Sequence, residues 1–281
     1  DVSLCFLPLS HVFERAWTYY CLHKGMTIYV NHNPADIQKT LKEVRPTAMC
    51  AVPRFWEKVY AGVNDKIDSF SPFLQKLAHR AIAVGKRYNI DYQANNLEAP
   101  AMLKLQYKFW SATLFKILKK AIGIENGNIF PCAGSQVVDE MNIFLHSVGI
   151  NLVAGYGLTE STATVSCFNP HNRDYTVQSV GDIMPEVEVK IGENDEILLR
   201  GKTITSGYYN KPEANKEAFI DGWFRTGDAG RIDEKGRLYI TERIKTMITK
   251  YKIGGIILYR KNFNTYQDML NLIKQLKELN K

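Results

Sequence analysis

The ten residues NLVAGYGLTE, at positions 151–160, carry the strongest indication of the fold. Residues 151–154 are a short apolar run of the kind that forms a buried parallel strand. Gly155 and Gly157 flank a tyrosine directly after it, which predicts a sharp turn that a ligand can approach closely. Open α/β sheets bind their ligands where strands end in such turns. We therefore predict an α/β sheet with a ligand site at this turn.

Two polar residues, Thr159 and Glu160, complete the predicted turn. A threonine hydroxyl can bond a phosphate oxygen, and a carboxylate beside it can hold the Mg²⁺ that accompanies a nucleoside triphosphate. The alternative is an ordinary tight turn in which Glu160 is only solvated. The six residues 155–160 alone leave both interpretations open.

Strands and helices alternate on the N-terminal side of this turn. Apolar runs predict strands at residues 4–7, 26–30, 47–52 and 128–131. Helical periodicity predicts helices at residues 15–22, 33–45, 55–67, 71–88, 100–122 and 137–147. This alternation predicts a layered α/β body.

The predicted helix 100–122 combines aromatic residues with lysines. Its apolar side chains, from Leu103 to Ile117, are expected to share one face, with the lysines lying toward the other. A basic amphipathic helix of this kind can lie on an anionic bilayer. A core-facing helix with a solvated lysine face is the alternative.

From about residue 179 the pattern changes to antiparallel β-structure. Alternating apolar residues at 187–191 before a polar turn at 192–195 predict a hairpin, and a turn at 234–236 predicts another. We therefore predict three parts: an α/β body over residues 1–176, a small β-subdomain over 177–241, and a segment with a helical tail over 242–281.

The composition limits the class of protein. Of the 281 residues, 45% are hydrophobic and 23% charged, which is typical of a soluble globular protein. The five cysteines form no CxxC pair and argue for a reducing, cytoplasmic location. No apolar run of about eighteen residues occurs, so we expect no membrane span, and no signal peptide is visible. The net charge of +7 suits anionic ligands or an acidic membrane surface, and also solubility alone; we expect no nucleic-acid partner.

Further motifs surround the central turn. They are LPLSHVFE at 7–14, VRPT at 44–47, VPRFWEK at 52–58, RG at 200–201, GYY at 207–209 and GWFRTGD at 222–228. In this order and spacing the set resembles the AMP-forming acyl-CoA synthetases, most closely the bacterial long-chain fatty acid–CoA ligases. The segments at 44–47 and 52–58 resemble the long-chain branch in particular. The resemblance runs from Asp1 to about Ile248, and the tail beyond does not follow it.

The resemblance implies the α/β body of these enzymes with an antiparallel, barrel-like β-subdomain. It also implies ATP-dependent activation of a fatty acid to its acyl-CoA through an acyl-adenylate, with Mg²⁺ and with coenzyme A as co-substrate. By resemblance, Glu160 holds Mg²⁺, Thr159 bonds a phosphate oxygen, and His11 shapes the pocket at the acyl–adenylate junction. The implied contacts of ATP or AMP are Gly134, Ser135, Gln136, Gly155, Tyr156, Gly157, Thr159, Asp228 and Arg243, and the implied hinge is Lys245.

The same resemblance implies a Ser/Thr/Gly-rich phosphate loop and a lid lysine that these 281 residues do not contain. We therefore expect little or no ligase activity from them alone. Peripheral contact with the inner face of a membrane is also an expectation. Two alternatives stay open: an adenylate-forming ligase for another carboxylic acid, and a non-catalytic acyl- or membrane-binding relic of the core.

Overall fold

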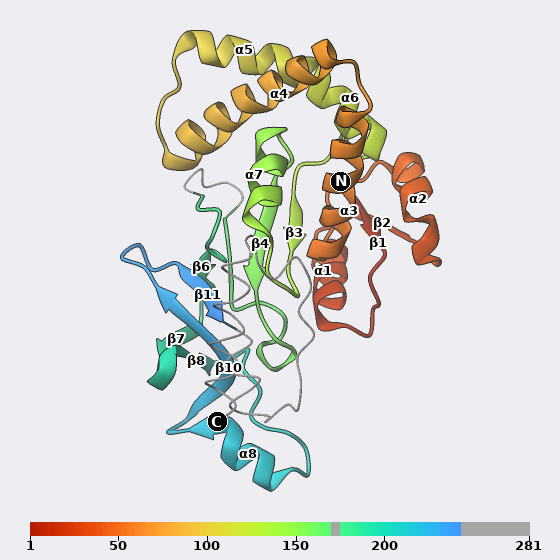
Figure 1. Cartoon of the computed structure of the whole chain (residues 1–281). Helices are drawn as coiled ribbons and strands as arrows, with labels where there is room; N and C mark the ends of the chain where they lie inside the picture. The colour runs from red at the N-terminus through yellow and green to blue at the C-terminus, as the bar shows by residue number, and fades with distance from the viewer. Residues whose placement is uncertain (170–174, 243–281) are drawn as a thin grey trace. The chain divides into compact units, whose positions relative to one another are not determined.

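The computed structural model describes residues 1–169 and 175–242 (Figure 1). The chain divides into two compact units, residues 1–185 and 186–281. The sequence-based boundary at 176/177 lies nine residues before the division at 185/186, and the three-part domain assignment stays a prediction. Arg243, the predicted hinge Lys245 and the predicted helical tail lie outside the described residues.

The first unit is built on a largely parallel set of strands. Its strands are β1 (Val2–Cys5), β2 (Thr27–Val30), β3 (Phe130–Cys132), β4 (Leu152–Tyr156), β5 (Ser166–Cys167) and β6 (Asp182–Ile183). β1 pairs with β2 and β3 with β4 in parallel, whereas β5 and β6 add antiparallel neighbours after β4.

The segment 47–52 lies between β1 and β3. It makes parallel bridges from Ala48 to Ser3 and Ile129, and from Ala51 to Cys132. A continuous strand was predicted here, but the segment forms only these isolated bridges. These bridges connect the two pairs of parallel strands.

Helices cover the strands of this unit. They are α1 (Val12–His23), α2 (Ile37–Val44), α3 (Pro53–Asp68), α4 (Pro72–Lys86), α5 (Ala101–Ala112), α6 (Leu114–Ile122) and α7 (Asp139–Ser147). Short helical turns accompany them at Pro34–Asp36, Arg87–Tyr92, Gln93–Asn95 and Thr159–Ser161. Proline occupies the first position of α3 and of α4, where its fixed φ suits a helix start and no hydrogen bond is lost. The predicted α/β fold class is confirmed.

The predicted helix 100–122 is in fact two helices. Thr113 separates them with φ −110° and ψ −95°, and its hydroxyl donates to the Phe109 carbonyl oxygen at 2.7 Å. Bonding of a threonine hydroxyl to the preceding turn bends helices. The break rotates α6 relative to α5, and Ile117 is 67% exposed while Leu103 is buried. The prediction that these two side chains share one face is therefore wrong.

The core of the first unit centres on Trp56 of α3, which is fully buried. Its ring packs edge-on against Phe55 and Phe130, with centroid distances of 5.0 Å and 5.2 Å. Phe130 begins β3, so this aromatic contact fixes α3 against the strand that leads into residues 133–136.

The second unit is antiparallel, as predicted. Its strands are β7 (Val187–Ile191), β8 (Glu196–Gly201), β9 (Phe219–Ile220), β10 (Trp223–Ile232) and β11 (Leu238–Glu242), and its helix is α8 (Pro212–Ala218). A short helical turn, Glu193–Asp195, connects β7 to β8. The sheet order is β11-β10-β8-β7, with β9 beside β10. Within residues 186–242 the sheet is not closed, and a barrel-like form stays a prediction.

Candidate functional site

The turn after β4 begins later than the sequence suggested. Gly155 and Tyr156 belong to β4 and pair with Cys167 and Ser166 of the antiparallel strand β5. The sharp turn predicted at Gly155 is therefore wrong, because β5 extends the ladder by two residues. The chain leaves the sheet only at Gly157.

Gly157 is held against backbone from the far side of the turn. A Cβ atom at this position would lie 1.7 Å from the carbonyl oxygen of Ala163. The turn closes on itself there, and only a residue without a side chain fits.

Ser161 stabilises the turn from inside. Its buried hydroxyl accepts a hydrogen bond from the Leu158 N–H at 2.9 Å and donates one to the Leu158 carbonyl at 3.1 Å. Thr159 is exposed at the turn surface and Glu160 is half-buried. The capping role of Ser161 was not predicted from the sequence. The three-residue spacing between Leu158 and Ser161, which is the spacing of a helix capping box, could have indicated it.

Two residues after the turn adopt unfavourable backbone angles. Thr162 has φ +54° and Ala163 has φ +82°, in the left-handed region that residues with a side chain seldom occupy. Such conformations cluster at functional sites, where the surrounding structure maintains them. The strained backbone at Thr162 and Ala163 and the close backbone packing at Gly157 are both typical of a turn that forms part of a functional site.

The second predicted nucleotide segment follows β3. Gly134, Ser135 and Gln136 are all exposed, and Gly134 has φ +98°. Because β3 and β4 are parallel neighbours, with Cys132 paired to Ala154, residues 133–136 and 157–160 leave the same edge of the sheet. The fold thus brings two of the predicted ligand-binding segments to one edge.

His11 lies at the start of α1, on the loop that leaves β1. Its Nδ1 accepts the Phe13 N–H at 3.3 Å, so the imidazole caps the helix, and the side chain is exposed. β1 runs parallel to the strands that carry the other two segments, through the bridges at Ala48. His11 therefore follows the same end of a parallel strand as they do.

An apolar cavity of about 480 Å³ adjoins these segments. Phe13 and Trp17 of α1 line it, together with Ala133, Tyr156 and Ala163. Trp17 is fixed there, because its Nε1 donates to Ser3 Oγ at 3.0 Å and its ring stacks on Tyr20. The cavity reaches the residues next to both Gly134 and Gly157, so an apolar group inside it would lie beside the polar turn.

Glu14, at the end of the motif at 7–14, carries a buried carboxyl. Its Oε2 accepts the Leu7 N–H at 3.0 Å, and its Oε1 accepts the Thr18 hydroxyl at 3.4 Å. Burial raises the pKa of Glu14, and the neighbouring thiol of Cys5 has its pKa raised to about 11, chiefly by burial and then by this carboxyl. Glu14 thus anchors the loop that leads to His11.

Glu14 makes the stability of the chain depend on pH. A raised pKa means that the folded state binds the proton more tightly than the unfolded state, so the free energy of unfolding falls as pH rises above the ordinary glutamate pKa of about 4.3. Glu14→Gln removes this slope while the amide oxygen still accepts the Leu7 N–H. We expect the variant to become more stable relative to the wild type as pH rises from 4 to 7, because the wild type alone must ionise a buried carboxyl. Urea denaturation at both pH values measures this, and parallel pH profiles would contradict it.

Asp228 lies in the second unit. It is 6% exposed and lies within β10, four residues before the end of that strand. The register of β10 against β8 shifts between Arg225 and Ala229, which marks a bulge around this residue.

Two side chains fix the backbone of this bulge. Thr226 Oγ1 accepts the Asp228 N–H at 3.0 Å and donates to the Ile197 carbonyl at 2.8 Å. Glu196 accepts the Gly227 N–H at 3.1 Å and pairs with Arg225 at 2.8 Å. These contacts hold the main chain that presents Asp228.

The described residues do not meet the requirements of a metal site made of protein ligands alone. Residues 1–169 and 175–242 contain no group of three or more His, Cys, Asp or Glu side chains that could hold a metal ion.

In the same part of the chain, every helix is too short or too polar to cross a membrane.

Comparison with known proteins connects these features to a family. The sequence profile of the AMP-binding enzymes matches residues 1–209. The chain is 30% identical over 249 residues to the long-chain-fatty-acid–CoA ligase FadD15 of Mycobacterium bovis, covering 87% of this chain and 40% of that protein. It is 29% identical over 284 residues to long chain acyl-CoA synthetase 5 of Arabidopsis thaliana, covering 96% of this chain and 41% of that protein.

A solved structure shares the fold. A double mutant of o-succinylbenzoate CoA synthetase from Bacillus subtilis, bound to a product analogue, superposes with a TM-score of 0.58 at 18% identity, covering 86% of this chain and 41% of that one. The chain thus spans about 40% of the length of these curated relatives.

Proposed function

This chain belongs to the AMP-binding enzyme family, and on that premise we propose that the protein activates long-chain fatty acids through an acyl-adenylate. The described residues of the first unit would supply the acyl- and nucleotide-binding part of that activity. The observation that carries the proposal is the apolar cavity of about 480 Å³ beside the edge where residues 133–136 and 157–160 emerge. The names of the curated relatives support the long-chain substrate.

Each segment at this edge has a proposed task. The exposed residues Gly134, Ser135 and Gln136 would lie against the adenine and ribose, where a glycine allows close approach. Tyr156, which lines the cavity from β4, would contact the adenine side. His11 would lie at the acyl–adenylate junction as a shaping group, with its position fixed by the helix cap and by Glu14.

The donor set of the turn fits a nucleotide with Mg²⁺. Magnesium is held in proteins by one or two carboxylates together with substrate phosphates and water, so a larger cluster of protein ligands is not needed. Glu160 would supply the carboxylate, and the exposed hydroxyl of Thr159 would donate to a phosphate oxygen. When bound, the ion would neutralise phosphate charge.

The proposed reaction begins with attack of a fatty acid carboxylate on the α-phosphate of ATP, releasing pyrophosphate. Two anions approach each other in this step, so positioning and charge neutralisation are the main tasks of the protein. The thiolate of coenzyme A would then displace AMP from the acyl carbonyl. Ribose contacts of Asp228 and Arg243, and the hinge role of Lys245, are proposed on the family resemblance.

The competing proposal within the family is a ligase for a short or aromatic acid. The cavity supports the long-chain proposal over an acetate-specific ligase, because an acetyl group would leave most of it unfilled. Location in the cytoplasm and peripheral membrane contact both remain predictions.

Filling the cavity tests the long-chain proposal. Ala16 lines the cavity from α1, so Ala16→Trp would occupy part of its volume. We expect a hexadecanoyl-sulfamoyl-adenosine, a stable acyl-adenylate mimic, to bind at least about tenfold more weakly, which is about 1.4 kcal/mol. The acetyl analogue should bind as tightly as before, because only its nucleotide contacts matter.

A matched control is Ala61→Trp, which adds the same side chain at an exposed position of α3 outside this cavity. It should bind both mimics like the wild type. Equal weakening of the acetyl and hexadecanoyl mimics by Ala16→Trp would contradict the proposed acyl cavity.

A further inference from the structure

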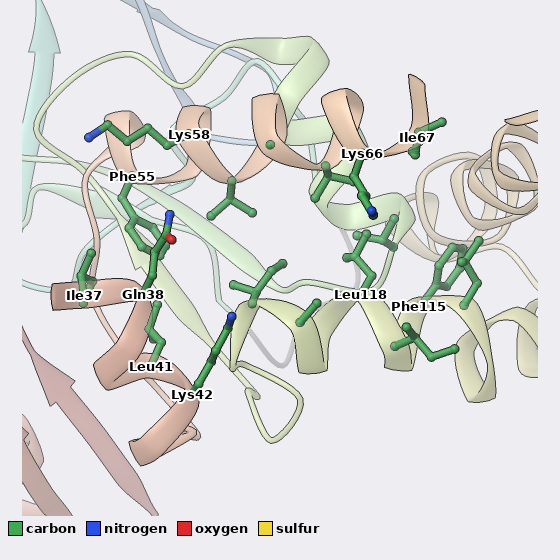
Figure 2. A pocket seen from close by; sticks show the side chains of 18 of the residues that line it. Ile37, Gln38, Leu41, Lys42, Phe55, Lys58, Lys66, Ile67, Phe115 and Leu118 are labelled. Atoms are coloured by element: carbon green, nitrogen blue, oxygen red, sulfur yellow. The ribbon is translucent and has the colours of Figure 1, made fainter. Parts of the chain in front are cut away.

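The first unit contains a second, larger cavity that the proposed reaction does not use. Its volume is about 660 Å³, within the range of small-molecule sites, and it lies among α2, α3, α4 and α6 (Figure 2). Among the residues that the structure describes, it shares no lining residue with the cavity beside the turn.

This second cavity is elongated, and its walls are mostly apolar. Phe55, Val59, Val63 and Ile67 recur every four residues along α3 and line one side. From Phe55 to Ile67 the helix axis advances about 18 Å at 1.5 Å per residue. Leu114 and Leu118 of α6 line the opposite side. The dimensions suit one extended acyl chain.

The polar lining of the cavity is basic. Lys42, Lys58, Lys66 and Gln38 line it, and the described lining residues include no aspartate or glutamate. In Figure 2, Lys42 rises from α2 and Lys66 descends from α3 toward the same gap. The ion pairs found within residues 1–169 and 175–242 involve none of these three lysines. An apolar ligand with an anionic head would therefore find both kinds of contact here.

We propose that this cavity binds the carboxylate form of a long-chain fatty acid at a site separate from the acyl-adenylate site. The chain would lie along α3 against α6, and the carboxylate would contact Lys42 and Lys66. A neutral lipid would gain nothing from the lysines, and a cationic amphiphile would be repelled by them. The protein would thus hold a second molecule of the substrate class that we propose for it.

Gly62 provides a direct test. An added Cβ at Gly62 would meet no atom within 4 Å, and this residue lines the cavity in the middle of α3. Gly62→Leu would therefore place a branched apolar side chain at the cavity wall with no clash at its Cβ, and leucine favours helix more than glycine does. The matched control is Ala61→Leu, which adds leucine to the adjacent exposed position of the same helix.

The experiment is photo-crosslinking of the chain with a diazirine-bearing palmitate, followed by digestion and mass spectrometry of the labelled peptides. We expect labelling of α3 and α6 peptides in the wild type and in Ala61→Leu, and at least a tenfold reduction in Gly62→Leu. Labelling of α1 and β4 peptides reports the proposed substrate site and should not change in Gly62→Leu. The two sites are therefore scored separately, and failure of one is distinguishable from failure of the other.

The head-group requirement is tested in the same assay. The double variant Lys42→Gln/Lys66→Gln should reduce labelling of α3 and α6, and a hexadecyl-trimethylammonium competitor should displace the probe poorly compared with palmitate. Unchanged α3 and α6 labelling in Gly62→Leu would overturn the proposal. Equal competition by the cationic amphiphile would overturn it as well, because the cavity would then bind any apolar chain.

Discussion

Gly157→Ala is expected to abolish binding of the acyl-adenylate mimic and to lower the free energy of unfolding by about 3 kcal/mol. The methyl group would be placed 1.7 Å from the Ala163 carbonyl oxygen, a distance that no adjustment of a side chain relieves, because the clash is with backbone. Residues 157–163 would have to move apart, and with them Thr159 and Glu160. Calorimetric titration with the mimic and urea denaturation measure the two effects.

The control for this substitution is Gly62→Ala, which adds the same methyl group where no atom lies within 4 Å. It should bind the mimic like the wild type and be as stable or slightly more so, because alanine favours helix. Retention of mimic binding by Gly157→Ala would mean that the turn does not contact the ligand, and the proposed roles of Thr159 and Glu160 would be lost.

Trp56→Ala has the second large expected effect, a loss of about 3–5 kcal/mol in the free energy of unfolding. Trp56 is fully buried, and its removal leaves a cavity between Phe55 and Phe130. Because Phe130 begins β3, the loosening should extend to residues 133–136, and binding of the mimic should weaken together with stability. Urea denaturation followed by circular dichroism measures the change.

Trp56→Phe separates the ring packing from the indole N–H. The Nε1 atom of Trp56 has no hydrogen-bond partner among the described residues, and an unpaired buried donor costs about 1–3 kcal/mol. We therefore expect phenylalanine to recover most of the stability that alanine loses. Phe109→Ala, at an exposed site on α5, should change stability by less than about 0.5 kcal/mol. A Trp56→Ala variant as stable as this control would contradict the assigned core.

The sequence predicted the features that depend on local pattern. Apolar runs and helical periodicity predicted β1 to β4 and the helical regions of the first unit to within a few residues, but not β5 and β6. The hairpins of the second unit followed from period-two alternation and polar turns. The positions of Gly134 and Thr159 after parallel strands also followed from chain order, because neighbouring parallel strands end at one sheet edge.

The sequence-based predictions failed where the local structure depends on contacts between residues far apart in the sequence, or on the backbone conformation of a single residue. Gly155 looked like a turn residue, but pairing with Cys167 draws it into β4. The break at Thr113 depends on one backbone conformation that no composition reveals, and it exposes Ile117. The burial of Glu14 could not be predicted from the sequence, because it depends on how the loop between Leu7 and Glu14 folds and brings the Leu7 N–H to the carboxylate.

The proposed binding of a long-chain acyl-adenylate is tested most directly by calorimetric titration of the 281-residue chain with hexadecanoyl-sulfamoyl-adenosine beside its acetyl analogue. We predict saturable one-to-one binding at the adenylate site, at least about a hundredfold tighter for the hexadecanoyl mimic, since burial of four methylenes at about 0.8 kcal/mol each exceeds the 2.8 kcal/mol required. Equal affinities would contradict the acyl cavity, and absence of binding by a chain with a native circular dichroism spectrum would contradict the adenylate site itself.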